Sequence, residues 1–195
     1  IEPTEEEREQ GRKLPTRVHR ALAALVATGH IRIIVTTNFD RLIERALQDN
    51  GIEPFVIASA DQARSAPPLH SRRCVVIKVH GDHMSPNLKN TLAELDTYEP
   101  EWSDLLQRVL RDYGLIVVGW SANWDPALRN LIHVHECQVY TTFWAHRGDL
   151  GPAAQGLIKG RVSVPIAIQD ADSFLDTVAE QVAALRELTA ATPVT

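Results

Sequence analysis

Short apolar runs alternate with longer amphipathic segments along the chain. Some runs are almost continuously apolar, which is typical of strands buried on both faces of a parallel sheet. Others are shorter and rich in β-branched and aromatic residues, which also favours strands. Pro165 has no amide proton to donate, so its strand is expected at a sheet edge or in an irregular pairing. The predicted strands are residues 33–35, 55–58, 74–79, 115–118, 139–144 and 162–168.

Helical periodicity occupies the segments between these strands. Apolar residues recur three and four positions apart, as on the buried face of an amphipathic helix. The glycine-rich segment 148–160 lacks a strong pattern and is predicted to be a loop. The predicted helices are a short polar one at 4–10 and longer ones at 16–28, 40–50, 92–113 with an interruption near Pro100, 126–132 and 174–185.

Strands that alternate with helices indicate an α/β fold. We expect a doubly wound, mostly parallel, Rossmann-like sheet with helices on both faces. No internal repeat is visible in the sequence, and its length suits one sizeable core. The chain is therefore expected to form one domain over residues 1–188, followed by a frayed tail over residues 189–195.

The composition is that of an ordinary soluble domain. Of the 195 residues, 44% are hydrophobic and 23% are charged, and the formal net charge is −5. An acidic chain without a concentrated basic stripe is not expected to bind nucleic acid directly. No apolar stretch approaches the roughly 20 residues that cross a bilayer, and no basic-then-apolar leader is present. We therefore expect no membrane partner and a cytoplasmic location.

The cysteines and histidines do not suggest a metal centre. Cys74 and Cys137 lie far apart in apolar contexts and are expected to be reduced thiols in the core. Two cysteines cannot supply the four ligands of a structural zinc site. His133 and His135 alternate with Cys137, but they straddle a predicted helix end, so we expect no metal and in particular no zinc.

Polar residues follow three of the buried strands at the point where each strand ends. These corners are Thr36-Thr37-Asn38-Phe39-Asp40, His80-Gly81-Asp82 and Gly119-Trp120-Ser121. In a parallel sheet they lie on one edge, where ligands bind outside the carboxyl ends of the strands. The corners would bring together a candidate base in His80, an amide in Asn38 and a carboxylate in Asp40.

These motifs resemble those of the Sir2 (sirtuin) family. Its motif order is matched over roughly residues 16–145 by the run from Thr36 to Asp40, by Lys78-Val79-His80-Gly81, and by Gly119-Trp120-Ser121 with Asp125. The resemblance is closest to the bacterial SIR2-like branch found in antiphage defence proteins. It implies that NAD, or an ADP-ribose-like nucleotide, is the ligand.

The resemblance also implies a role for each matching residue. His80 would act as general base, Asn38 would contact the nicotinamide ribose and position a water, and Asp40 would help to hold the nicotinamide side of NAD. Gly119 and Ser121 would touch the adenosine side. The expected catalytic residues are His80, Asn38 and Asp40, and the expected nucleotide-binding residues are Thr36, Thr37, Asn38, Asp40, Gly119, Trp120, Ser121 and Asp125.

Simpler roles remain open for several of these side chains. Asp40 or Asn38 could cap the following helix without touching a ligand. His80 could be an ordinary polar residue at a strand end. The hydroxyl of Ser121 suits a cap or a sugar contact better than a nucleophile, because the second glycine of a nucleophile elbow is absent. Trp120 could stack on adenine or simply pack in the core.

Two departures from the family pattern shape the functional prediction. Sirtuin deacylases carry a zinc ribbon on four cysteines, which this chain cannot build. The family also opens with a strand and a Gly-Ala-Gly loop that cradles the pyrophosphate, whereas no Gly-x-Gly occurs in this sequence. The chain therefore looks truncated at its N-terminus relative to the family, and low NAD affinity is expected of it as it stands.

The resemblance thus favours an NAD-consuming domain of a larger bacterial protein. The expected reaction is hydrolysis of NAD to nicotinamide and ADP-ribose. Alternatives are a module of the same fold that senses NAD or ADP-ribose without turnover, a scaffold domain with a vestigial site, and an NAD-dependent protein deacylase, which the missing cysteines disfavour. Other domains of the parent protein, and a second copy of the chain, are the expected protein partners.

Overall fold

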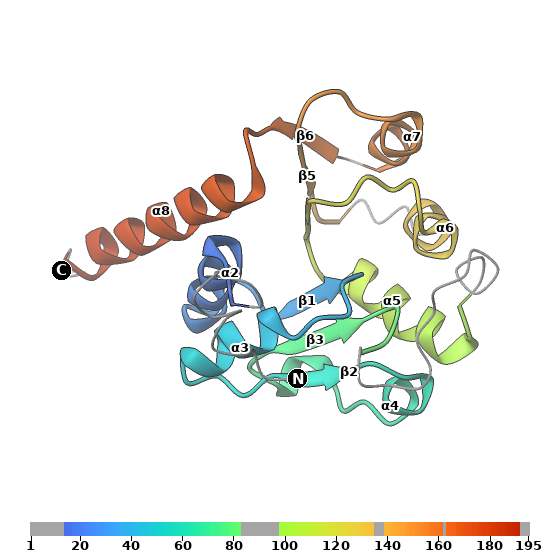
Figure 1. Cartoon of the computed structure of the whole chain (residues 1–195), viewed down its shortest axis with the longest axis horizontal. Helices are drawn as coiled ribbons and strands as arrows, with labels where there is room; N and C mark the ends of the chain where they lie inside the picture. Colours follow the sequence, from blue (N-terminus) through green and yellow to red (C-terminus); the bar gives the residue numbers. More distant parts are fainter. Residues whose placement is uncertain (1–13, 83–97, 135–138, 162, 192–195) are drawn as a thin grey trace.

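Parallel strands and helices alternate along the chain in the computed structural model, which describes residues 14–82, 98–134, 139–161 and 163–191 (Figure 1). The elements in chain order are α2 (Arg17–Ala27), β1 (Ile33–Thr36), α3 (Leu42–Asp49), β2 (Phe55–Ile57), α4 (Ala60–Arg64), the 3-10 helix η1 (Leu69–Ser71), β3 (Val75–Lys78), α5 (Pro100–Asp112), β4 (Leu115–Val118), α6 (Pro126–Val134), β5 (Thr142–His146), α7 (Pro152–Gly160), β6 (Ser163–Ala167) and α8 (Ala171–Ala191).

The strands form two parallel sheets. Their hydrogen-bonded order is β1-β3-β2 in the first sheet and β4-β5-β6 in the second. In the first sheet Thr36 lies opposite Lys78, and in the second Leu115 lies opposite Thr142. The expected α/β class with a mostly parallel, Rossmann-like arrangement is confirmed, and the strands divide between two sheets.

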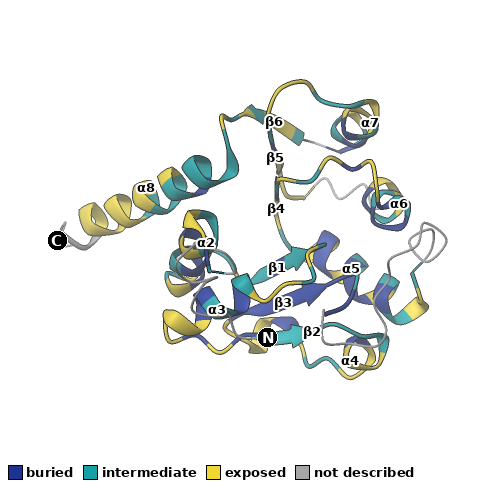
Figure 2. Ribbon diagram, viewed as in Figure 1, coloured by how far each residue is buried: buried dark blue, intermediate teal, exposed yellow. Residues whose placement is uncertain are grey.

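Helices cover both faces of the first sheet. Ile34 and Val76 pack with α2 and α3 on one face, while Val75 and Ile77 point into a cluster with α5 on the other. Strand β3 is therefore buried along its whole length, as its unbroken apolar run predicted (Figure 2). The cluster under α5 continues through Val117 and Trp144 into the second sheet, so both sheets share one hydrophobic core.

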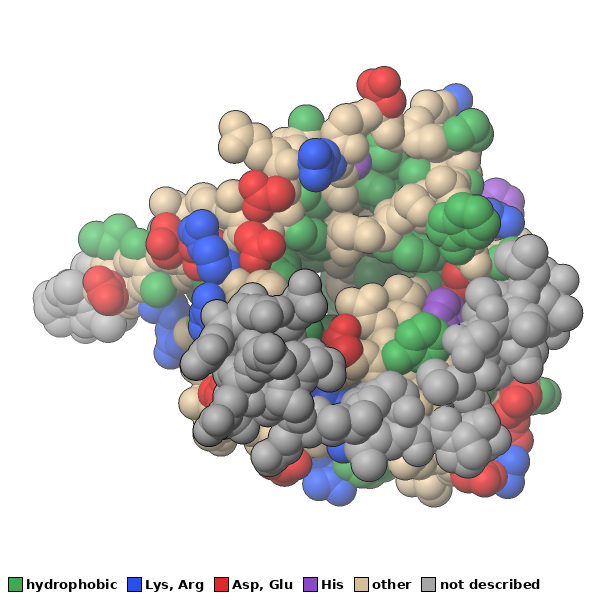
Figure 3. Space-filling view, in the orientation of Figure 1, with side chains coloured by type: hydrophobic (Ala, Val, Ile, Leu, Met, Phe, Trp, Pro, Cys, Tyr) green, Lys and Arg blue, Asp and Glu red, His purple; other side chains and the backbone are tan. Residues whose placement is uncertain are grey.

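The second sheet carries α6 and α7 on the side of this shared core. On its other side Val118 packs with Leu175 at the start of α8 and with Leu25 of α2. Helix α8 continues along α2 through Val178 and Val182, and its outer end beyond them is exposed (Figure 2). In the space-filling view, hydrophobic side chains gather on the upper half of the drawn face, around the second sheet, whereas α8 presents many charged side chains (Figure 3).

Two predictions about individual elements are confirmed. Strand β6 contains Pro165 and is an edge strand of its sheet, where a missing amide proton leaves no ladder bond unmade. Helix α2 ends at Ala27 with Thr28 as its C-cap, which agrees with the helix predicted over residues 16–28. Gly29 has a φ of 79°, and the amides of Gly29 and His30 donate to the carbonyls of Val26 and Leu25, which is the Schellman arrangement.

The segment 148–160 was predicted to be a loop, and this was wrong. Residues Pro152–Gly160 form helix α7, with Gly151 at the N-cap and Pro152 in the first turn, where a proline is tolerated. Ala154 and Leu157 are buried three positions apart and anchor the helix to the core. Gly156 lies on the exposed side, so its cost of about 1 kcal/mol relative to alanine is outweighed by this packing.

Several element ends also differ from prediction, most clearly in β5 and α8. Strand β5 begins at Thr142 rather than at residue 139, because its ladder with β4 begins at the pair Leu115 and Thr142. Helix α8 continues through Ala191, so residues 189–191 are helical although they were expected to belong to a frayed tail. The expected helices at 4–10 and 92–97, together with His135 and Cys137, lie outside the described residues.

Candidate functional site

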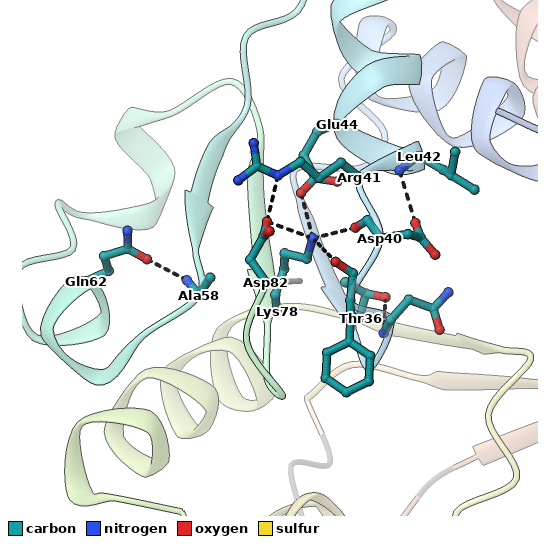
Figure 4. A network of polar contacts seen from close by, with 11 residues as sticks. Thr36, Asp40, Arg41, Leu42, Glu44, Ala58, Gln62, Lys78 and Asp82 are labelled. Carbon is teal, nitrogen blue, oxygen red and sulfur yellow. Dashed lines mark hydrogen bonds and ion pairs between the residues drawn. The ribbon is translucent and has the colours of Figure 1, made fainter. Parts of the chain in front are cut away.

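The side chain of Lys78 holds the loop after β1 in place. This lysine is fully buried at the end of β3, and its ammonium group donates to the backbone carbonyls of Phe39, at 3.1 Å, and Asp40. The same group lies 3.1 Å from carboxylate oxygens of Glu44 and Asp82 (Figure 4). Lys78 therefore connects the loop that carries Asn38 and Asp40 both to α3, through Glu44, and to the segment after β3, through Asp82.

The charges around Lys78 balance within a small network, whose one exposed member is Arg41. Arg41 donates from Nε to Asp82 at 2.9 Å, so two cations face two carboxylates. Glu44 is 7% exposed and Asp82 is 5% exposed. Buried charges in such a network depend on one another, because removing one partner leaves the others uncompensated at a cost of about 3 to 5 kcal/mol. The loop after β1 is therefore a firmly held part of the structure.

His80 is held by a carboxylate that follows β4 of the second sheet. Nε2 of His80 lies 2.7 Å from Oδ2 of Asp125, whose side chain is almost fully buried. The hydroxyl of Tyr98 donates to the same oxygen at 2.8 Å, and the backbone amide of Leu128 donates to Oδ1 at 2.8 Å. Burial, and then the nearby charge of Asp125, raises the pKa of Tyr98, so this hydroxyl stays protonated and remains a donor.

This arrangement defines which nitrogen of His80 can act as a base. A neutral imidazole that donates from Nε2 to a carboxylate leaves Nδ1 as its acceptor. The carboxylate also stabilises the imidazolium that forms when Nδ1 takes a proton. The side chain of His80 is 11% exposed, so the ring is sheltered and yet reachable.

The first two corners lie side by side. Thr36 pairs with Lys78, so Asn38 and His80 each follow their paired strand residue by two positions. The amide of Val79 donates to the carbonyl of Thr36 at 3.1 Å, and the rings of Phe39 and His80 lie 6.0 Å apart. The convergence of these corners on one sheet edge agrees with the sequence prediction.

The corner after β4 lies next to this edge, because Asp125, which follows it, contacts His80. Gly119 has a φ of 73°, and the rings of Trp120 and Trp144 lie 5.8 Å apart, which places Trp120 partly in the core. The hydroxyl of Ser121 is exposed and accepts from the amide of Asn123 at 3.4 Å, as a local turn residue does. Backbone of this corner is thus accessible next to the Asp125 that contacts His80.

The residues after β1 have defined local roles. Oδ1 of Asp40 accepts from the amide of Leu42 at 3.0 Å, which forms a local turn just ahead of α3. The N-cap residue of α3 is Arg41, and no side chain within the described residues caps it, so the capping role expected of Asp40 or Asn38 is not the one observed. The hydroxyl of Thr36 accepts from the amide of Asn38 at 3.0 Å, which shapes the turn. The side chains of Asn38 and Asp40 are exposed, and Thr37 is half-buried. Contact of these residues with a nucleotide stays a prediction.

Sequence reasoning missed the supporting residues. Lys78, Glu44, Asp82 and Tyr98 were assigned no role, although one signal was present: Lys78 is a charged residue within an otherwise apolar buried run. A lysine at such a position requires buried partners, because lysine is almost never fully buried unless paired. Asp125 was expected to bind nucleotide, and this stays a prediction; in the structure its oxygens contact His80, Tyr98 and the start of α6.

Within the described ranges, no group of three or more His, Cys, Asp or Glu side chains is placed to hold a metal ion.

Cys74 is a buried free thiol whose pKa is raised to about 11 by burial. Among the helices of the same ranges, none combines the length and apolar character needed to cross a bilayer.

Polar strand-end corners that meet at one edge, beside an imidazole backed by a buried carboxylate, occupy the place where parallel α/β domains typically bind their ligands. The profile of the SIR2-like domain matches residues 32–138, and the chain belongs to this family. Membership points to an NAD-related function and to NAD as the type of ligand. A comparison with curated proteins finds no match.

Proposed function

We propose that this domain hydrolyses NAD to nicotinamide and ADP-ribose. The observation that carries the proposal is the pairing of His80 with the buried Asp125 on the edge where the loop after β1 also lies. An imidazole with one nitrogen held by a carboxylate is the arrangement of a general base. Such a base has a use in NAD cleavage, because the attacking water must lose a proton.

In the proposed reaction the protein mainly binds NAD and orients it together with the attacking water. The bond between the nicotinamide nitrogen and the ribose breaks, and nicotinamide leaves as a neutral base with the bonding electron pair. A water oxygen bonds to the ribose carbon and gives its proton to Nδ1 of His80. We assign Asn38 to positioning this water and the nicotinamide ribose, and Asp40 to the nicotinamide side of the substrate.

The adenosine side of NAD is assigned to the corner after β4. Gly119 has no side chain, and space is open where a Cβ would stand, so a sugar or phosphate can approach its backbone closely. The exposed hydroxyl of Ser121 and the ring of Trp120 border the same corner, and Thr36 and Thr37 border the corner after β1. Asp125 belongs to the proposed site as the residue that orients His80.

We further propose that residues upstream of Ile1 in the parent protein complete the site. β1 and β4 are each an edge strand of their sheet. A parallel strand placed between them could pair with both, and its following loop would lie between the first and third corners. A glycine-rich loop there would supply the backbone amides that hold a pyrophosphate. The antiphage family resemblance further supports placing the domain in a larger, cytoplasmic bacterial protein.

The test is to incubate the N-terminally extended protein with NAD and to quantify nicotinamide and ADP-ribose. Release of the two products in equal amounts, without any added acylated peptide, supports hydrolysis. Nicotinamide release that requires an acyl-lysine peptide would instead identify a deacylase. Thermal stabilisation by NAD without turnover would identify a sensor, because a ligand that binds only the folded state raises its stability.

A further inference from the structure

A hollow of about 330 Å³ lies at the opposite edge of the first sheet from the candidate NAD site. The end of α2 with the following turn forms one wall, and the segment 70–73 ahead of β3 forms another. Arg32, which directly precedes β1, completes the lining. These segments precede their strands, whereas the candidate site follows them, so the two locations are separated by the length of the strands.

Three arginines line this hollow in a chain whose net charge is −5. They are Arg32, Arg72 and Arg73, and His70 lines the same space. In the part of the chain that the structure describes, none of these three arginines forms a salt bridge. The hollow is therefore a local concentration of uncompensated positive charge.

The guanidinium of Arg72 is partly fixed in place. Its central carbon lies 5.0 Å from the centre of the Phe55 ring, which is a cation–π contact. A guanidinium held in this way loses less conformational entropy when it binds a ligand than a freely moving one does. One side of the hollow is thus already arranged for binding.

Helix α2 ends at this hollow, and a helix end carries negative partial charge that would oppose an anion. Here its carbonyls already have donors. The carbonyls of Leu25 and Val26 accept from the backbone of the turn, and the carbonyl of Ala27 accepts from Arg73 at 3.4 Å. The arginines are therefore the charged groups that a ligand would meet.

We propose that this hollow binds a small phosphate-bearing anion of nucleotide size, at a site separate from the candidate NAD edge. Arginine forks match phosphate oxygens through paired, charge-assisted hydrogen bonds. The volume lies at the lower end of the range for small-molecule pockets, about 300 to 1,000 Å³. The acidic character of the chain as a whole argues against a long polyanion that would run beyond the hollow.

The test is calorimetric titration of the 195-residue chain with inorganic pyrophosphate at low ionic strength. The double variant Arg32→Gln/Arg73→Gln should weaken binding at least about tenfold, which corresponds to about 1.4 kcal/mol. The matched control is Arg147→Gln/Arg186→Gln, which removes the same charge from exposed arginines elsewhere and should change affinity less than about twofold. Arg32→Gln alone, which breaks no described hydrogen bond, provides a weakened variant if the double variant unfolds.

Three outcomes would overturn the proposal. One is equal weakening in the double variant and its matched control, which would indicate only long-range attraction. Another is loss of pyrophosphate binding in Ser121→Ala with no loss in Arg32→Gln, which would place the anion at the candidate NAD site. The third is binding of a single-stranded 20-mer of DNA through these arginines without any binding of pyrophosphate, which would identify a polynucleotide surface instead.

Discussion

The imidazole of His80 and the carboxylate of Asp125 lie 2.7 Å apart although 45 positions separate them in the chain. His80 follows β3 of the first sheet and Asp125 follows β4 of the second, so this hydrogen bond connects the two sheets at the edge that forms the candidate site. The pair therefore links the geometry of the site directly to the packing of the whole domain.

The His80–Asp125 pair predicts non-additive effects on nicotinamide release by the N-terminally extended protein. Asp125→Asn keeps the shape of the side chain but removes its charge, so kcat should fall at least about tenfold. In a His80→Ala background the same substitution should have little further effect, because the residue that Asp125 orients is gone. Full additivity of the two losses in the double variant would show that the residues act independently.

Lys78→Met should destabilise the domain strongly. The substitution keeps most of the side-chain volume but leaves Glu44 and Asp82 buried without their shared cation. The free energy of unfolding, measured by urea denaturation, should fall by about 3 to 5 kcal/mol. Lys159→Met removes an exposed lysine and should change it by less than about 0.5 kcal/mol. Similar values for the two variants would refute the structural role of the network.

Gly156→Ala should stabilise the domain by about 0.5 to 1 kcal/mol, since alanine is favoured over glycine inside a helix. Nothing lies within 4 Å of the position that the new methyl group would take. The comparison variant is Gly51→Ala, which should destabilise because Gly51 has a φ of 68°. Thermal denaturation of both variants tests whether residues 152–160 form helix α7 or the loop that the sequence suggested. A loss of stability in Gly156→Ala would favour the loop.

Cys74 should react slowly with iodoacetamide in the folded protein. Burial raises the pKa of its thiol to about 11, so at pH 8 the reactive thiolate is roughly 100-fold rarer than for a cysteine of ordinary pKa. The measurement is best made in a Cys137→Ser background, where Cys74 is the remaining thiol. Denaturation in urea should restore ordinary reactivity. Fast alkylation without denaturant would show that β3 opens readily.

Much of the fold could be predicted because apolar periodicity reports burial directly. The unbroken run before His80 identified β3 as a strand buried on both faces, and the polar residues after β1, β3 and β4 indicated the edge that carries the candidate site. Helix α7 was missed because its glycines are local helix breakers, and only tertiary packing of Leu157 shows why they are tolerated.

The supporting contacts of the site could not be predicted in the same way. Asp125 contacts His80, and Lys78 contacts Glu44, only because separate elements fold together. A sequence pattern reports which face of an element is apolar, but it does not report which distant polar groups meet. The convergence of Arg32 with Arg72 and Arg73 was overlooked for this reason, since no basic stripe exists along the chain itself.

The most direct measurement is the rate of nicotinamide release from NAD by the N-terminally extended protein and by its His80→Ala variant. If His80 is the general base, kcat should fall by about 10² to 10⁴, while His133→Ala, which removes an exposed histidine on α6, should leave it nearly unchanged. An undiminished rate in His80→Ala would contradict the proposed role of His80 and, with it, the mechanism built on its pairing with Asp125.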